Sequence, residues 1–99
     1  MADDPIPEKD LKNLMEQLGR VHGDKDRIRL INAAADGWSF TCQQVKDLLE
    51  EQHYGDAAVA TAINLFDRVV DEDKFEEVVI EALPYEEDKK QVREALGFE

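Results

Sequence analysis

The sequence has a single cysteine, no apolar run long enough to form a membrane helix, and half as many basic as acidic residues. With Cys42 alone, no intramolecular disulfide can form, which fits a reducing compartment. A membrane-spanning helix needs about 20 consecutive apolar residues, and the N-terminal residues lack the basic and apolar regions of a signal peptide. We therefore expect a soluble, cytoplasmic protein without a transmembrane segment.

The chain also lacks the short motifs that position catalytic groups or phosphates. It has no Gly-rich nucleotide-binding loop and no Gly-x-Ser-x-Gly motif, and Ser39 is its only serine. A helix N-terminus can lower the pKa of a thiol such as that of Cys42, but a half-buried, inert cysteine is the commoner case. We expect no enzyme activity, no catalytic residues and no cofactor, with a thiol-reactive protein as the least favoured alternative.

Positive charge is scarce, because 12 Lys and Arg stand against 24 Asp and Glu, for a formal net charge of −12 at pH 7. Nucleic-acid binding neutralises phosphates with Lys and Arg, and anionic membranes attract basic segments, so neither is an expected partner. The acids are concentrated in residues 67–88, where 10 of them accompany only two bases. We expect a partner of this half to be a protein or peptide with a basic surface.

The residues that are present follow the helical period throughout, and no segment alternates like a strand. The apolar stripes predict six helices, which lie within residues 7–23, 24–37, 41–53, 56–70, 73–83 and 86–96. At the start of the third helix, Thr41 and Gln44 have capping-box spacing, flanked by Phe40 and Val45 as a hydrophobic staple. Asp73 and Glu76 repeat this spacing at the start of the fifth.

Several features recur at intervals of 32 to 35 residues. Asp24, Asp56 and Asp88 are 32 residues apart, and each is expected to begin the second helix of a pair. The pattern Asp-x-x-x-Phe occurs at residues 36–40 and again at 71–75. This period predicts a single all-α domain over residues 1–99, built as three stacked antiparallel αα-hairpins. Residues 1–6 are expected to form a flexible tail, and a six-helix death-domain-like bundle is the alternative fold.

Metal-binding patterns are weak. His22, His53 and Cys42 are too few and too scattered for a zinc site. An EF-hand loop that begins at Asp71 would place Ala82 at position 12, where a bidentate Glu is needed. We therefore expect no metal site and interpret Asp71 and Asp73 as turn and N-cap residues. A calcium-responsive regulatory domain that uses the acids of residues 71–77 is the alternative function.

Two phrases of the sequence are typical of a known family. Residues 40–49 read FTCQQVKDLL, which has the form Phe-[Ser/Thr]-x-x-Gln-Val-x-x-Leu-Leu, and residues 70–75 read VDEDKF. Through these phrases residues 26–98 resemble the helical domain-of-unknown-function family 4476. The resemblance implies a small helical module of unassigned function, often attached to other domains, and it supplies no catalytic residues.

Together these observations predict a noncatalytic protein-interaction or scaffold module. Its acidic face would recognise a basic protein or peptide surface, and Trp38, in a loop after Gly37, belongs to a residue type enriched at binding hot spots. The predicted partner-binding residues are Trp38, Asp67, Asp71, Glu72, Asp73, Glu76, Glu77 and Glu81.

Overall fold

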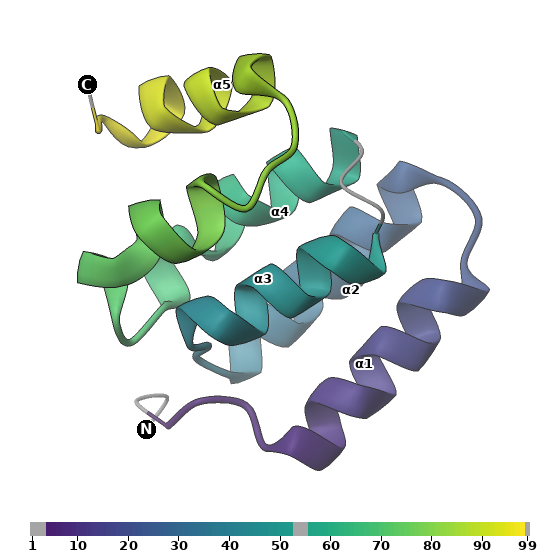
Figure 1. Ribbon diagram of the computed structural model, residues 1–99. Helices are drawn as coiled ribbons and strands as arrows, with labels where there is room; N and C mark the ends of the chain where they lie inside the picture. The colour runs from purple at the N-terminus through teal and green to yellow at the C-terminus, as the bar shows by residue number, and fades with distance from the viewer. Residues whose placement is uncertain (1–3, 53–55, 99) are drawn as a thin grey trace.

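The computed structural model describes residues 4–52 and 56–98 (Figure 1). The helical elements are α1 (Glu8–Arg20), α2 (Asp24–Gly37), α3 (Cys42–Glu51), α4 (Asp56–Leu65), the 3-10 turns η1 (Phe66–Arg68) and η2 (Glu72–Lys74), the π-helix η3 (Glu76–Ile80) and α5 (Glu86–Leu96). Within these residues there is no strand, only two isolated β-bridges. The predicted all-α class is confirmed.

The helices form a flat slab with extents of 33 × 31 × 17 Å. Its thickness corresponds to about two packed helices, because helix axes pack 8–10 Å apart. α4 contacts α2, α3 and α5, and it is apolar on almost every side, as expected of a helix buried among others. Consecutive elements also contact each other, as α1 does with α2 and η3 with α5. The three-hairpin stack and the death-domain-like bundle both stay predictions.

The N-terminal segment is anchored on the loop between α2 and α3. Ile6 is 3% exposed; its N–H donates to the Ser39 carbonyl at 2.8 Å, and its carbonyl accepts from the Gln44 amide at 2.9 Å. Residues 1–3 lie outside the described residues. The predicted flexible tail over residues 1–6 is therefore corrected at its inner end, because burial and two hydrogen bonds place Ile6 in the folded domain.

The start of α3 is built as the sequence predicts. The Gln44 N–H donates to the Thr41 hydroxyl at 3.1 Å, and the Thr41 N–H donates to the Gln44 side-chain oxygen at 2.9 Å, which completes the capping box. The staple residues Phe40 and Val45 are both fully buried. This helix start is confirmed in every part, because its signals are local in sequence.

The fourth helix ends five residues earlier than predicted. α4 stops at Leu65 and continues as the 3-10 turn η1, after which Val69 is extended. The Val70 N–H donates to the Phe40 carbonyl at 2.9 Å, and the Phe40 N–H donates to the Arg68 carbonyl at 2.9 Å. These bonds to a distant segment replace helical ones, and β-branched valines accept an extended backbone readily.

The fifth helix differs most from its prediction. Residues 72–80 form a 3-10 turn and then a π-helix, in which the Glu81 N–H donates to the Glu76 carbonyl at 3.0 Å. The predicted capping box of Asp73 and Glu76 does not form, because no side chain caps either short element. Glu76 instead bonds Arg93, as described below.

The aspartates of the predicted repeat occupy different helix positions. α2 and α4 begin at Asp24 and Asp56 as expected, whereas α5 begins at Glu86, so that Asp88 is its third residue. The N-cap of α2 is Gly23, whose φ of 109° favours glycine. The matching turn before Asp56, residues 53–55, lies outside the described residues. The Asp88 position is thus corrected by two residues.

Candidate interaction surface

The structure divides the predicted acidic residues into three groups. One carboxylate holds the start of α3, two are paired with bases on α5, and four are exposed and make no ion pair to any described residue.

Asp71 caps a helix to which it is not adjacent in sequence. Its Oδ1 accepts a hydrogen bond from the Cys42 N–H at 2.9 Å, and its backbone carbonyl accepts one from the Cys42 Sγ at 3.1 Å. The first N–H groups of a helix have no partner within it, and a carboxylate there also complements the helix dipole. Asp71 is half-buried in this contact and therefore does not belong to the free acidic surface.

The thiol of Cys42 is not activated by its place at the first position of α3. Burial raises its pKa to about 12, and the hydrogen bond to Asp71 and the charges of Asp71 and Asp73 act in the same direction, whereas Lys74 opposes them. The nucleophilic form of cysteine is the thiolate. At neutral pH this side chain is protonated and fully buried, so the dipole of α3 does not make it reactive.

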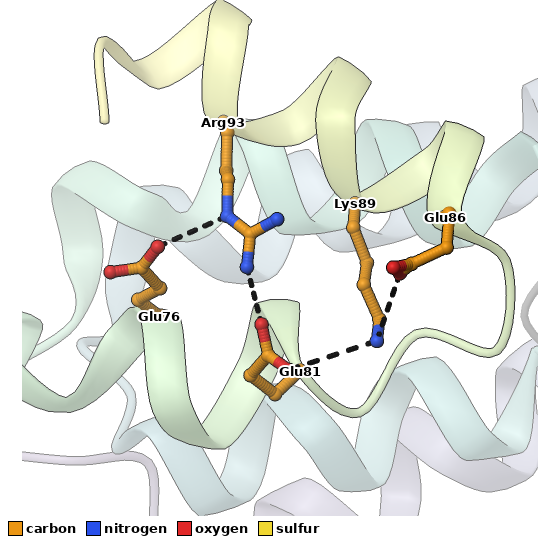
Figure 2. A network of polar contacts seen from close by, with 5 residues as sticks. All are labelled: Glu76, Glu81, Glu86, Lys89 and Arg93. Atoms are coloured by element: carbon orange, nitrogen blue, oxygen red, sulfur yellow. Dashed lines mark hydrogen bonds and ion pairs between the residues drawn. The ribbon is translucent and has the colours of Figure 1, made fainter. Parts of the chain in front are cut away.

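Two of the predicted acids are bound by bases from α5 (Figure 2). Arg93 Nε lies 3.0 Å from Glu76 Oε2, and Arg93 Nη2 bonds Glu81. Lys89 Nζ lies 3.7 Å from Glu81 and 3.2 Å from Glu86. The hydrogen bond to Glu76 is the largest of several contributions that raise the pKa of Arg93. These contacts neutralise Glu76 and Glu81 and connect η3 to α5.

The sequence does not reveal this network of ion pairs. Arg93 is 17 residues from Glu76 and 12 from Glu81, so no local spacing reveals the pairs. The one available signal is that Lys89 and Arg93 are four residues apart, and therefore on one face of a helix that follows an acidic segment.

Four of the predicted acids remain exposed: Asp67, Glu72, Asp73 and Glu77. They lie on three short elements, η1 to η3, and make no ion pair in the part of the chain that the structure describes. We call these four residues the unpaired acids.

Trp38 is the one non-acidic residue of the predicted partner surface. It is half-buried and lines a hollow of about 350 Å³ together with Leu14 of α1 and Leu30 and Ala34 of α2. None of the predicted acids lines this hollow. Trp38 and the predicted acids therefore line no common hollow, although the loop that carries Trp38 runs beside η1, where the Phe40 N–H donates to the Arg68 carbonyl at 2.9 Å.

No metal centre is evident in residues 4–52 and 56–98. These residues hold no group of three or more His, Cys, Asp or Glu side chains arranged to bind a metal ion, and His53 lies outside them. In the same residues no helix is both long and apolar enough to cross a membrane.

A family model described as Domain of unknown function (DUF4476) matches residues 5–96. The chain belongs to this family. The match extends the resemblance, which the sequence motifs place over residues 26–98, to include α1 and the anchored segment before it. No curated protein and no solved structure shows a significant match to this DUF4476 domain.

Proposed function

We propose that this DUF4476 domain is a noncatalytic protein-interaction module and that its unpaired acids recognise a basic surface on a protein or peptide. The observation that supports the proposal is the selective pairing around η3. Arg93 and Lys89 neutralise the acids that face α5, whereas Asp67, Glu72, Asp73 and Glu77 have no such partner within residues 4–52 and 56–98. Residues 67–77 hold six acids and two bases, Arg68 and Lys74, so the segment keeps a net negative charge that a basic partner would neutralise.

The interaction should depend strongly on ionic strength. The unpaired acids are exposed, and salt screens charges that lie more than about 8–10 Å apart at physiological ionic strength. Exposed complementary charges act mainly by accelerating association and selecting partners. We therefore expect affinity to fall as salt rises, chiefly through a slower association rate.

A synthetic Lys/Arg peptide without large apolar residues tests this proposal. Fluorescence anisotropy with the full chain would compare the wild type with a variant in which the four unpaired acids become amides: Asp67→Asn, Glu72→Gln, Asp73→Asn and Glu77→Gln. We expect the variant to lose most of the binding and most of its salt dependence.

A matched control removes four acids that are already ion-paired on other helices: Glu16→Gln, Asp24→Asn, Asp26→Asn and Glu94→Gln. The net charge changes equally in both variants, so this control should bind the peptide nearly as well as the wild type. Equal losses in both variants would show that net charge, and not the unpaired acids, attracts the peptide.

The calcium-responsive alternative stays a prediction. No arrangement of ligands in the described residues favours it. A calcium titration followed by amide chemical shifts tests it, and saturable shifts at residues 71–77 would support it.

A further inference from the structure

A groove with an apolar floor runs between α1 and α3. It consists of two adjoining hollows of about 410 and 390 Å³, which share Met15 of α1 and Asp47 of α3 in their walls. Leu11, which is 8% exposed, and the half-buried Met15 form the floor. They are four residues apart and therefore lie one above the other on the same face of α1.

The rim of this groove is acidic. Glu8 contributes a carboxylate from α1, and Asp47, Glu50 and Glu51 contribute three from α3, whereas Lys12 is the one base in the lining. The two helices are in contact along this side of the slab. The rim carboxylates therefore flank the two apolar side chains of the floor.

The rim acids have no ion-pair partner among the residues that the structure describes. Several acids on other helical faces are ion-paired with a base three or four residues away, as in Glu16 with Arg20 and Glu94 with Lys90. No ion pair to a rim acid occurs within residues 4–52 and 56–98; the one recorded contact is the Gln43 amide, which donates to Asp47 at 3.1 Å. The charge of the rim is thus available to a ligand.

We propose that the α1/α3 groove binds an amphipathic basic helix. A large apolar side chain of the ligand would rest on Leu11 and Met15, and its flanking Lys and Arg side chains would reach the rim acids. Helix-in-groove recognition uses this combination of apolar anchors and flanking charge, and methionine adapts its shape to different anchors. This inference goes beyond the unpaired acids and does not depend on them.

Other occupants fit the groove less well. Both hollows are open to solvent, whereas a small-molecule site encloses most of its ligand. A second copy of this chain would bring a net charge of −12 to an already acidic rim, and like charges disfavour that approach. A basic helix with an apolar anchor matches both the floor and the rim.

Two labelled peptides of about 14 residues, roughly four helical turns, test the proposal. Both carry the same Lys and Arg residues on an Ala background; the anchored peptide has Leu at positions i and i+4, and the anchorless peptide has Ser there. We expect the full chain to bind the anchored peptide at least about tenfold more tightly, because buried apolar anchors dominate such interfaces.

Variants of this chain locate the site. Met15→Gln should abolish the preference for the anchored peptide, and the triple change Asp47→Asn, Glu50→Gln and Glu51→Gln should weaken its binding and reduce the salt dependence. Leu30→Gln is the matched control, because Leu30 is also a half-buried apolar residue but lines the hollow beside Trp38. Circular dichroism checks that each variant keeps its helical content.

The outcomes separate this proposal from the proposed function. Amide chemical-shift changes concentrated on α1 and α3 would support the groove. If the full chain binds the anchored peptide but not the anchorless one, the groove proposal stands and the proposed role of the unpaired acids is contradicted. Equal affinity for the two peptides, shifts confined to η1–η3, or an equal effect of Leu30→Gln would each overturn the groove proposal. Self-association that the anchored peptide displaces would reassign the groove to a second copy of the chain.

Discussion

The hydrogen bond from the Cys42 N–H to Asp71 should be worth a measurable part of the stability of the domain. It joins two residues 29 positions apart, at a length of 2.9 Å. Replacing Asp71 with Ala removes the acceptor and leaves a buried helix N–H without a partner. Hydrogen bonds to charged groups contribute about 1.5–3 kcal/mol, so we expect Asp71→Ala to lower the free energy of unfolding by about 2 kcal/mol.

Two further variants divide this effect into its parts. Asp71→Asn keeps an acceptor and loses only the charge at the N-terminus of α3, which is worth about 0.3–1 kcal/mol. Asp73→Ala removes an exposed carboxylate from the same segment, and exposed substitutions of this kind change stability by at most about 0.5 kcal/mol. The expected order of stability is therefore wild type and Asp73→Ala, then Asp71→Asn, then Asp71→Ala.

Urea unfolding followed by circular dichroism measures these differences at neutral pH. Thermal melts provide a second readout, in which 2 kcal/mol corresponds to roughly 8–16 °C for a domain of this size. The reasoning is refuted if Asp71→Ala is as stable as Asp73→Ala, because the bond to Cys42 would then contribute nothing to folding.

Two other predictions follow from the charges around α3 and α5. Because the pKa of Cys42 rises from about 9 to about 12 on folding, its unfolded thiol ionises first. The contribution of Cys42 to the free energy of unfolding should thus be constant below pH 9 and fall above it, by up to about 1.4 kcal/mol per pH unit. Urea unfolding at a series of pH values measures this fall, which should be weaker in Cys42→Ala. Arg93→Gln removes the contacts to Glu76 and Glu81 and should lower the melting temperature more at low than at high salt. The same variant should bind the basic peptide more tightly, since it frees the Glu76 carboxylate and leaves Glu81 with Lys89 alone; unchanged affinity would argue against a role for local charge.

The sequence predicts the structure best where its signals are local. The capping box at Thr41 and Gln44 and the burial of Phe40 and Val45 depend on residues within one turn of each other, and all are confirmed. The boundaries of α1, α2 and α5 follow from proline, glycine and apolar spacing in the same way.

The predictions fail where a segment distant in sequence makes the contact that the local pattern assigns to a neighbouring residue. Val70 leaves the helical pattern because its N–H bonds the Phe40 carbonyl, thirty residues earlier. The sequence predicts Asp71 only as a turn residue before the following helix, whereas its side chain caps α3. Phe98 shows the same limit: its ring packs edge-to-face on Phe66 at 5.5 Å, a contact that no periodic pattern of α5 indicates.

The candidate site was predicted only in part for the same reason. The acidic segment is evident from composition, but which carboxylates are neutralised depends on where α5 places Arg93 and Lys89. The groove between α1 and α3 could not be seen at all, because its floor and rim come from helices whose packing the sequence leaves open.

Both proposed surfaces are connected to α3: the groove includes its acids, and the segment of the unpaired acids is bonded to its first residue through Asp71. Its N-terminus is held by its own capping box, by Asp71 from the acidic segment and, through Gln44, by the carbonyl of Ile6. The rim acids Asp47, Glu50 and Glu51 lie on the C-terminal half of this helix and are therefore fixed relative to α1. The segment that contains Asp71 is likewise fixed relative to α3. A surface that is ordered before binding loses less conformational entropy when a partner arrives. The bond between Cys42 and Asp71 thus supports recognition as well as folding, and Asp71→Ala should weaken binding of the basic peptide even at temperatures where the variant is fully folded.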